Sequence, residues 1–306
     1  MNKIILIFLA VLLGENAVQA KPISKKALAQ KKVYYSLSEA FKTPSAVYHI
    51  NLRQQNITDL TADFGLLKNL QYANLMKNSL AHLPPQIVEA KNLQSLFLRQ
   101  NKLTEFSEDL GHLPFLTELD LDGNQIAHVS HEIGFLRNLK FLDLSSNRIG
   151  VLPEQIGGLL SLQTLELDKN LLKELPAGIG SLKNLQVLLL GNNQIGSLPP
   201  SLVLLKNLRS LNLDNNKLKN LPGNIGVLKE LRSLTLSNNE ISELPESIVN
   251  LPKLELLSLG NNNLERMPKN LLKLKKLKTL LVAGNNFSAE EKARITKALP
   301  ETDIRF

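Results

Sequence analysis

Leucine and isoleucine recur along most of this chain at fixed positions of a repeat that is 23 residues long. In residues 139–161, LKFLDLSSNRIGVLPEQIGGLLS, the apolar positions are Leu139, Leu142, Leu144, Ile149, Leu152, Ile156 and Leu159. One asparagine recurs in steps of 23, at Asn78, Asn101, Asn124, Asn147, Asn170, Asn193, Asn216, Asn239, Asn262 and Asn285, with Gln55 at the first position. No insertion or deletion breaks this register. Since one unit cannot bury its apolar side alone, the units are expected to stack.

Each unit contains the segment LxLxx, whose alternation of apolar and variable residues is the pattern of a strand with one buried face. In residues 139–161, Leu142 and Leu144 would point inward, whereas the residues on either side of them would point outward. Asn147 must then turn the chain, and its amide can donate to and accept from backbone groups of the turn. An apolar residue there would cost about 1–3 kcal/mol for each group left unpaired. The repeat therefore predicts parallel strands in one ladder.

Proline occurs in the return path of most units, at Pro84, Pro153, Pro176, Pro199, Pro222, Pro245 and Pro268. Proline fixes φ and has no N–H, and a unit of 23 residues leaves little room for a helix of ordinary length. We therefore expect extended or short 3₁₀ return segments. Because these segments and the strands take different spacings, the stack should curve.

These positions resemble the leucine-rich-repeat pattern LxxLxLxxNxL, and eleven units in register extend the resemblance over residues 47–306. The chain is identified as a member of the leucine-rich-repeat superfamily, in its 23-residue LPxxI class. The resemblance implies an α/β solenoid with the shape of a horseshoe. Parallel strands would line the concave face, short 3₁₀ or extended segments the convex face, and helical caps both ends.

Residues 1–20, MNKIILIFLAVLLGENAVQA, have the outline of a secretory signal peptide, with one lysine, an apolar run and a small-residue cleavage site. The apolar run is too short to span a membrane. We therefore expect an exported protein, whether secreted, periplasmic or on the cell surface; the alternative is a buried N-terminal helix. The chain has no cysteine, which excludes a disulfide framework, a lipid-anchor cysteine and a thiol nucleophile.

The LPxxI repeat is similar to that of cytosolic eukaryotic scaffold proteins, but the signal peptide conflicts with that location. A closer overall resemblance is to exported, cysteine-free leucine-rich-repeat proteins of spirochaetal bacteria, through the leader, the segment YYSLSEAFKTP and the unbroken repeats. This resemblance implies a secreted or surface-exposed binding protein with partners among host molecules.

The ends of the chain differ from the repeats in composition. Residues 21–33 are basic and poor in large apolar side chains, so a flexible leader is expected there. Residues 34–306 are expected to form one repeat domain, since a solenoid grows along one axis. Capping-box spacing of Ser36 with Glu39 predicts an N-cap helix over 36–42, and that of Ser288 with Glu291 predicts a C-cap over 288–306.

The outward strand positions are the informative ones for function, because the LxL leucines form the core. They gather aromatic and arginine side chains near the N-terminus and acids in the middle repeats. The predicted partner-binding residues are Arg53, Tyr72, Met76, Phe97, Arg99, Glu118, Asp120, Asp122, Phe141, Asp143, Glu166 and Asp168. Asp120, Asp143 and Glu166 share one repeat position, so they would repel as ladder neighbours by roughly 1 kcal/mol or more per pair. A basic protein partner or a divalent cation would relieve this repulsion.

The formal net charge of +8 supports a second hypothesis. Lysines crowd both ends of the chain, at residues 21–32 and at Lys269, Lys273, Lys275, Lys276 and Lys278. These ends would hold an envelope- or matrix-associated protein to anionic glycan or lipid, and a solvated, solubilising edge is the other interpretation. No nucleic-acid partner and no transmembrane span is predicted.

Two pairs of residues suggest a metal site away from the strand face. Glu105 and His128 occupy one repeat position, and Glu108 and His131 occupy another, so stacking would bring together ligands that zinc accepts. The other interpretation is four unrelated polar residues on a convex surface. The sequence has no GxSxG, phosphate-binding glycine loop or HExxH, and an open strand face lacks an enclosing pocket. We therefore expect no enzyme, and no cofactor apart from this zinc hypothesis.

Overall fold

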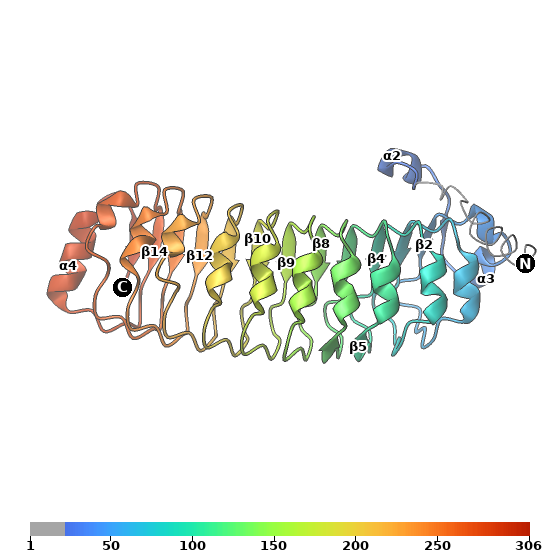
Figure 1. The fold of residues 1–306 in the computed structure, drawn as a ribbon, viewed down its shortest axis with the longest axis horizontal. Helices are drawn as coiled ribbons and strands as arrows, with labels where there is room; N and C mark the ends of the chain where they lie inside the picture. The colour runs from blue at the N-terminus through green and yellow to red at the C-terminus, as the bar shows by residue number, and fades with distance from the viewer. Residues whose placement is uncertain (1–21) are drawn as a thin grey trace, which may run out of the picture.

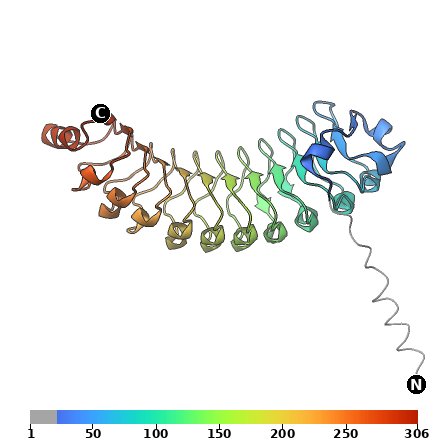
Figure 2. The same ribbon diagram turned by 90° about the horizontal axis from the view of Figure 1, so that it is seen from above.

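A computed structural model describes residues 22–306 of the chain, so the signal peptide predicted over 1–20 lies outside the described residues. Within residues 22–306, thirteen parallel strands form one sheet that runs from β1 to β15. These strands are β1 Val33–Tyr34, β2 His49–Asn51, β3 Tyr72–Asn74, β4 Ser95–Phe97, β6 Glu118–Asp120, β8 Phe141–Asp143, β9 Thr164–Glu166, β10 Val187–Leu189, β11 Ser210–Asn212, β12 Ser233–Thr235, β13 Leu256–Ser258, β14 Thr279–Leu281 and β15 Asp303–Arg305. Figure 2 shows the stack as an arc with the strands along its inner side.

The return segments lie on the outer side of this arc and are 3₁₀ helices (Figures 1 and 2). They are η1 Pro44–Ala46, η2 Ala62–Leu66, η3 Pro85–Glu89, η4 Glu108–His112, η5 His131–Phe135, η6 Glu154–Gly158, η7 Ala177–Ser181, η8 Pro200–Leu204, η9 Ile225–Val227, η10 Glu246–Asn250 and η11 Leu271–Lys273. In several units the predicted proline is the residue before the 3₁₀ helix, as at Pro153 and Pro176. The predicted horseshoe with a thin convex side is confirmed.

Columns of leucine fill the space between the sheet and the 3₁₀ helices. Leu142, Leu144 and Ile149 have no exposed surface, and their equivalents in the other units are buried in the same way. Burying one such side chain stabilises the fold by about 1.5–3 kcal/mol. The core therefore takes one face of the sheet and leaves the concave face open.

The recurring asparagine joins neighbouring repeats. Asn147 Nδ2 donates to the carbonyls of Leu121 and Leu144 at 3.0 Å, and its Oδ1 accepts from the N–H of Ile126 at 2.9 Å. Equivalent bonds occur along the stack from Asn78 to Asn285. Each asparagine therefore satisfies its own turn and the turn of the preceding repeat, as the sequence predicted.

The residue before each of these polar positions has positive φ. This set comprises Gln54, Lys77, Gln100, Gly123, Ser146, Lys169, Asn192, Asn215, Asn238, Asn261 and Gly284. At Gly284 a Cβ would meet Oδ1 of Asn261, so a larger residue there would have to displace that side chain. The left-handed conformation is rare for residues other than glycine and asparagine, and it sets the sharp exit from each strand.

The N-terminal end is closed by strand β1 and helix α3 Leu37–Ala40. Ser36 caps α3 by accepting from the N–H of Glu39 at 3.2 Å, so the predicted N-cap helix is present with Ser36 as its cap. The sequence predicts a flexible leader over 21–33, but the structure differs. Residues 25–28 form helix α2 Lys25–Leu28, and β1 pairs with β2 as the edge strand of the sheet.

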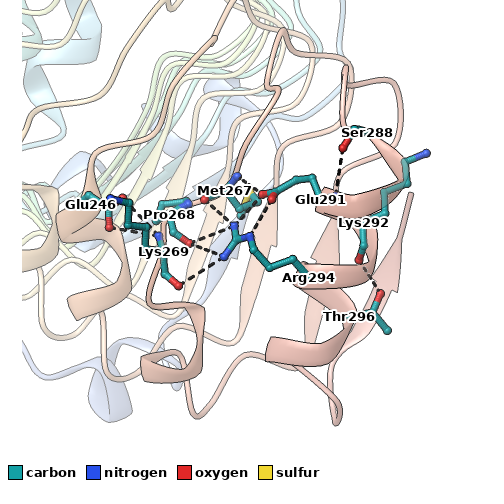
Figure 3. A network of polar contacts seen from close by, with 9 residues as sticks. All are labelled: Glu246, Met267, Pro268, Lys269, Ser288, Glu291, Lys292, Arg294 and Thr296. Carbon is teal, nitrogen blue, oxygen red and sulfur yellow. Dashed lines mark hydrogen bonds and ion pairs between the residues drawn. The ribbon is translucent and has the colours of Figure 1, made fainter.

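The C-terminal end is closed by helix α4 Ala289–Ala298 and strand β15, as predicted. Glu291 accepts from the N–H of Met267 at 2.7 Å, and Arg294 Nη2 donates to the carbonyl of Met267 at 2.7 Å. An ion pair of 2.7 Å joins Arg294 to Glu291 (Figure 3). These two side chains thus supply hydrogen-bond partners to the backbone of Met267 at the end of the stack.

Candidate binding surface

The register of the sheet arranges the outward side chains in columns along the concave face. One column holds the first residue of each strand, and another holds the third. In the second column Asp120 pairs with Asp143, and Asp143 pairs with Glu166. The repeat spacing therefore predicted correctly which of these side chains are neighbours.

An aromatic stack lies at the N-terminal end of the face. The ring centroids of His49 and Tyr72 are 4.3 Å apart, and those of Tyr72 and Phe97 are 5.2 Å apart. Burial lowers the pKa of His49 and, with a smaller contribution from Glu118, raises the pKa of Tyr72. His49 was missed from the sequence, although it shares a repeat position with Tyr72. All three side chains leave part of their surface exposed.

The other predicted residues of this zone are more scattered. Phe141 lies in the first column, next to Glu118, and is half-buried. Met76 is half-buried, whereas Arg53 and Arg99 are exposed. Arg99 Nε lies 2.9 Å from Asp122 Oδ2, so this arginine borders the acids and is not part of the aromatic stack.

The centre of the face holds five carboxylates, which we call the acidic block: Asp120, Asp122, Asp143, Glu166 and Asp168. Burial and repulsion from neighbouring carboxylates, Asp143 among them, raise the pKa of Glu166 to about 7 and that of Asp120 to about 6. Burial also raises the pKa values of Asp143 and Asp168. The column thus brings like charges together in a partly desolvated place.

Backbone N–H groups hold three of the five carboxylates of the acidic block, among them that of Asp120, which accepts from the N–H of Asp122 at 3.0 Å. Asp143 accepts from the N–H of Ser145 at 2.8 Å, and Asp168 accepts from the N–H of Gly191 at 2.7 Å. Four of the five carboxylates, together with Arg99, Ser145, Ser146 and Lys169, line a shallow depression of about 250 Å³. Within residues 22–306 the only ion pair to the block is that of Arg99 with Asp122. The block is therefore rigid and has few countercharges.

Glu118 lies beside the acidic block but has partners of its own. Its Oε2 accepts from Ser95 Oγ at 2.8 Å, and its Oε1 lies 2.8 Å from Lys25 Nζ. Burial would raise the pKa of Glu118, but the bonds from Lys25 and Ser95 outweigh burial and lower it. No pattern in the sequence points to the contact with Lys25, because the two residues are 93 positions apart and lie in different kinds of segment.

The C-terminal half of the face is nearly uncharged at its strand positions. Thr235 Oγ1 donates to Asn212 Oδ1 at 2.9 Å, and the hydroxyls of Ser237 and Ser258 are 2.6 Å apart. Leu189 follows Glu166 in the third-residue column and ends the row of acids. The recognition features therefore concentrate in the strands from β2 to β9.

The predicted zinc ligands do not come together. Strand β5 Glu105–Phe106 pairs with β7 His128–Val129, so Glu105 and His128 are neighbours as expected. Glu108 and His131, however, begin the 3₁₀ helices η4 and η5, and His131 Nε2 lies 2.9 Å from Glu132. Among residues 22–306 no three His, Cys, Asp or Glu side chains are close enough to hold a metal. The described residues therefore lend the zinc prediction no supporting geometry, because the repeat fixes columns but not the directions of side chains in different columns.

Membrane insertion by a helix finds no support in the described part of the chain. From residue 22 to the C-terminus, no helix combines the length and the apolar character that a membrane crossing requires.

Comparisons with known proteins agree with this architecture. A family model described as "Leucine rich repeat" matches residues 68–126, 183–241 and 229–287, and one described as "Leucine-rich repeat region" matches residues 114–204. A search of curated proteins found no significant match.

Similar solved structures come from bacterial and other proteins. An internalin of Listeria monocytogenes is 20% identical, with a TM-score of 0.79 over 92% of this chain and 82% of that chain. A chain from the octameric complex of latrophilin 3, Unc5D and the leucine-rich repeats of FLRT2 is 25% identical, with a TM-score of 0.68 over 84% and 82%. A leucine-rich-repeat protein of Leptospira interrogans is 29% identical over 90% and 100%, with a TM-score of 0.46.

Proposed function

Because this chain belongs to the leucine-rich-repeat family, we propose that its concave face binds a protein partner that presents basic side chains. The fold is typical of protein-binding domains, and members of the family generally act as non-enzymatic interaction scaffolds. One similar structure is itself a complex of leucine-rich repeats with other proteins. At about 4.8 Å per strand, the repeat strands give a face about 50 Å long, which suits a macromolecule better than a metabolite.

The acidic block carries this proposal. Asp120, Asp143 and Glu166 stand in one column, their pKa values are raised, and no ion pair within residues 22–306 reaches any of the three. A lysine or arginine of a partner would supply the missing countercharge in a site where backbone N–H groups already hold Asp120 and Asp143. Charged residues placed in this way raise association rates and select partners of opposite sign.

The aromatic stack supplies the apolar part of the same surface. Tyr72 and Phe97 are partly exposed and in contact, and Arg99 lies between the stack and the acids in sequence and space. Aromatic and arginine side chains are the residues most often found at energetic hot spots of interfaces. A partner with an apolar anchor next to basic residues would fit both zones.

The proposal includes export and the absence of catalysis. Export is supported by the pattern of residues 1–20, and a partner among host molecules by the resemblance to exported spirochaetal proteins. The absence of catalysis is supported by the open geometry of the face. Expression of the full gene followed by N-terminal mass spectrometry should find a mature chain that begins at Lys21 outside the cytoplasm; a retained Met1 would refute export.

A capture experiment with matched variants tests the binding surface. The immobilised wild-type chain is compared with Asp143→Lys, in the acidic block, and with Glu89→Lys, an exposed position on the convex helix η3. Both variants change the net charge equally. A partner captured by the wild type and by Glu89→Lys, but lost with Asp143→Lys and weakened by Phe97→Ala, supports the proposal. Equal capture by all four proteins would refute binding through the concave face.

The alternative of glycan or lipid binding through the lysine-rich ends has no specific support. Lys25, Lys32 and Lys278 each form an ion pair with an acid of the chain itself. A polyanion would have to compete with these acids. Binding of that kind would weaken steeply with salt and would survive Asp143→Lys, which distinguishes it from the proposed function.

A further inference from the structure

The basic N-terminal segment, residues 22–32, is anchored to the repeat domain at its base. Strand β1 fixes the following residues to the sheet, where Val33 pairs with His49. Lys32 forms an ion pair of 2.7 Å with Glu39, and Lys31 Nζ lies 4.6 Å from the ring centroid of Tyr48. The segment therefore starts from a defined place at the N-terminal end of the stack.

From this base the segment runs back along the repeats and reaches the concave face. Figure 1 shows α2 beyond the upper edge of the stack, level with the strands near β4, and Figure 2 shows it overlying the repeats of that region. The carbonyl of Ile23 accepts from Gln94 Nε2 at 3.4 Å, and Lys25 Nζ lies 2.8 Å from Glu118 Oε1. A hollow of about 500 Å³ lies between residues 22–25 and the repeat residues Phe115, Thr117, Asn138, Lys140 and Ser161. The segment thus contacts the repeats through Ile23 and Lys25 and leaves a hollow between itself and the repeats.

Glu118 is built to receive an ammonium group. It is half-buried on the first position of β6, its Oε2 is held by Ser95 Oγ, and its Oε1 points to Lys25. Asp120 of the acidic block lies two residues further along the same strand. In the next strand, β8, Phe141 pairs with Glu118. A lysine bound at Glu118 therefore lies at the border where the aromatic and acidic parts of the face meet.

The contact made by Lys25 is weak enough to be exchanged. The Lys25 side chain is 76% exposed, and the neighbouring Lys140 adds a second positive charge near Glu118. An ion pair with this exposure changes an equilibrium constant by at most about fivefold. Helix α2 has four residues and none of them is buried, so little else resists its displacement.

We propose that residues 22–32 act as an internal competitor for the concave face, in which Lys25 occupies at Glu118 the position that a lysine of the partner takes. This inference rests on the proposed function, since it assumes that the face binds basic groups. It also specifies the partner further: the partner presents a lysine on an exposed turn or short helix, as the segment itself does. Binding of the partner then releases residues 22–32 from the face.

The test uses the full chain and a fluorescent deca-lysine peptide, with fluorescence anisotropy at low salt as the readout. Lys25→Ala removes the competing ammonium group. Lys26→Ala is the matched control, because it removes the same charge from the next residue, which is exposed and makes no ion pair within residues 22–306. Lys25→Ala is expected to bind deca-lysine about two- to fivefold more tightly than Lys26→Ala.

Two further measurements make the outcome decisive. In a Glu118→Gln background, the difference between Lys25→Ala and Lys26→Ala should disappear. In the wild type, saturation with deca-lysine should accelerate hydrogen exchange in residues 22–32, where Leu28 N–H now donates to Ser24 O.

The failures of the two proposals are distinguishable. If the wild type binds deca-lysine through Asp143, but Lys25→Ala and Lys26→Ala bind equally, the internal competitor is refuted and the binding face stands. If the wild type and Lys25→Ala both fail to bind deca-lysine, the preference of the face for basic groups is refuted, and the competitor with it.

Discussion

Replacing Glu166 by glutamine should make the protein more stable at alkaline pH. Glu166 has an ordinary value of 4.5, and burial together with Asp143, Asp168, Asp120 and Asp122 raises its pKa to about 7. Between these two values the folded chain holds a proton that the unfolded chain has lost. The stability contributed at this site is therefore highest in acid and falls as the pH rises from about 4.5 to about 7.

The shift gives the size of the effect. A difference of about 2.5 pKa units corresponds to roughly 3 kcal/mol. Because Glu166 is only half-buried, solvent screening reduces this to about 1–2 kcal/mol. Glutamine has a similar shape and no charge, so Glu166→Gln should raise the free energy of unfolding by that amount at pH 8 and change it little at pH 4.

Thermal melts followed by circular dichroism at pH 4 and pH 8 measure this difference. The expected result is an increase in Tm of a few degrees at pH 8 only. Glu255→Gln is the control, since that half-buried carboxylate pairs with Arg232 and Lys278 and the bond from Lys278 lowers its pKa. It should give no gain. A gain for Glu166→Gln that is equal at both pH values, or absent at pH 8, would refute electrostatic repulsion in the acidic block.

Three further predictions follow from the same contacts. Asn147→Ala leaves the N–H of Ile126 without a partner and removes one of the two asparagine donors from each of the carbonyls of Leu121 and Leu144. It should cost about 1–3 kcal/mol, seen as a lower urea midpoint; an unchanged midpoint would contradict the role of the asparagine. Arg294→Ala removes a donor from the carbonyl of Met267 and should cost about 1–2 kcal/mol of stability. Hydrogen exchange should become faster only in the last repeat and α4; faster exchange throughout the chain would contradict a role of Arg294 confined to the C-terminal cap. The affinity for deca-lysine, measured by calorimetry, should fall by at least about fivefold from pH 8 to pH 5, because Glu166 and Asp120 take up protons with pKa values of about 7 and 6. An affinity that does not change with pH would exclude these carboxylates as ligands of the peptide.

The fold could be predicted from the sequence because one spacing fixes it. The asparagine series set the register, and the register placed Asp120, Asp143 and Glu166 side by side. The left-handed residue before each asparagine was not predicted, although the pairs at Asn192-Asn193 and Asn215-Asn216 carry a residue type that tolerates this conformation.

Features outside the repeat could not be predicted in the same way. Lys25 belongs to the N-terminal segment, which has no repeat, whereas Glu118 belongs to a repeat. No repeat spacing therefore predicts the contact between the two side chains. His131 lies beside Glu132 and not beside the other predicted zinc ligands, and a column does not determine that side-chain direction. Strand β1 was missed because it is two residues long and begins in a stretch whose composition is that of a leader.

The asparagine bonds make the number of repeats an adjustable quantity. Since every junction from Asn78 to Asn285 uses the same acceptor carbonyls and a donor N–H 21 residues upstream, one whole unit of 23 residues can be duplicated or excised without creating a new kind of junction. Deleting or inserting a number of residues that is not a multiple of 23 would place the asparagine side-chain amides opposite the wrong backbone carbonyls. Units inserted after β9 would extend the uncharged half of the face and leave the acids, the aromatic rings and both end caps where they are.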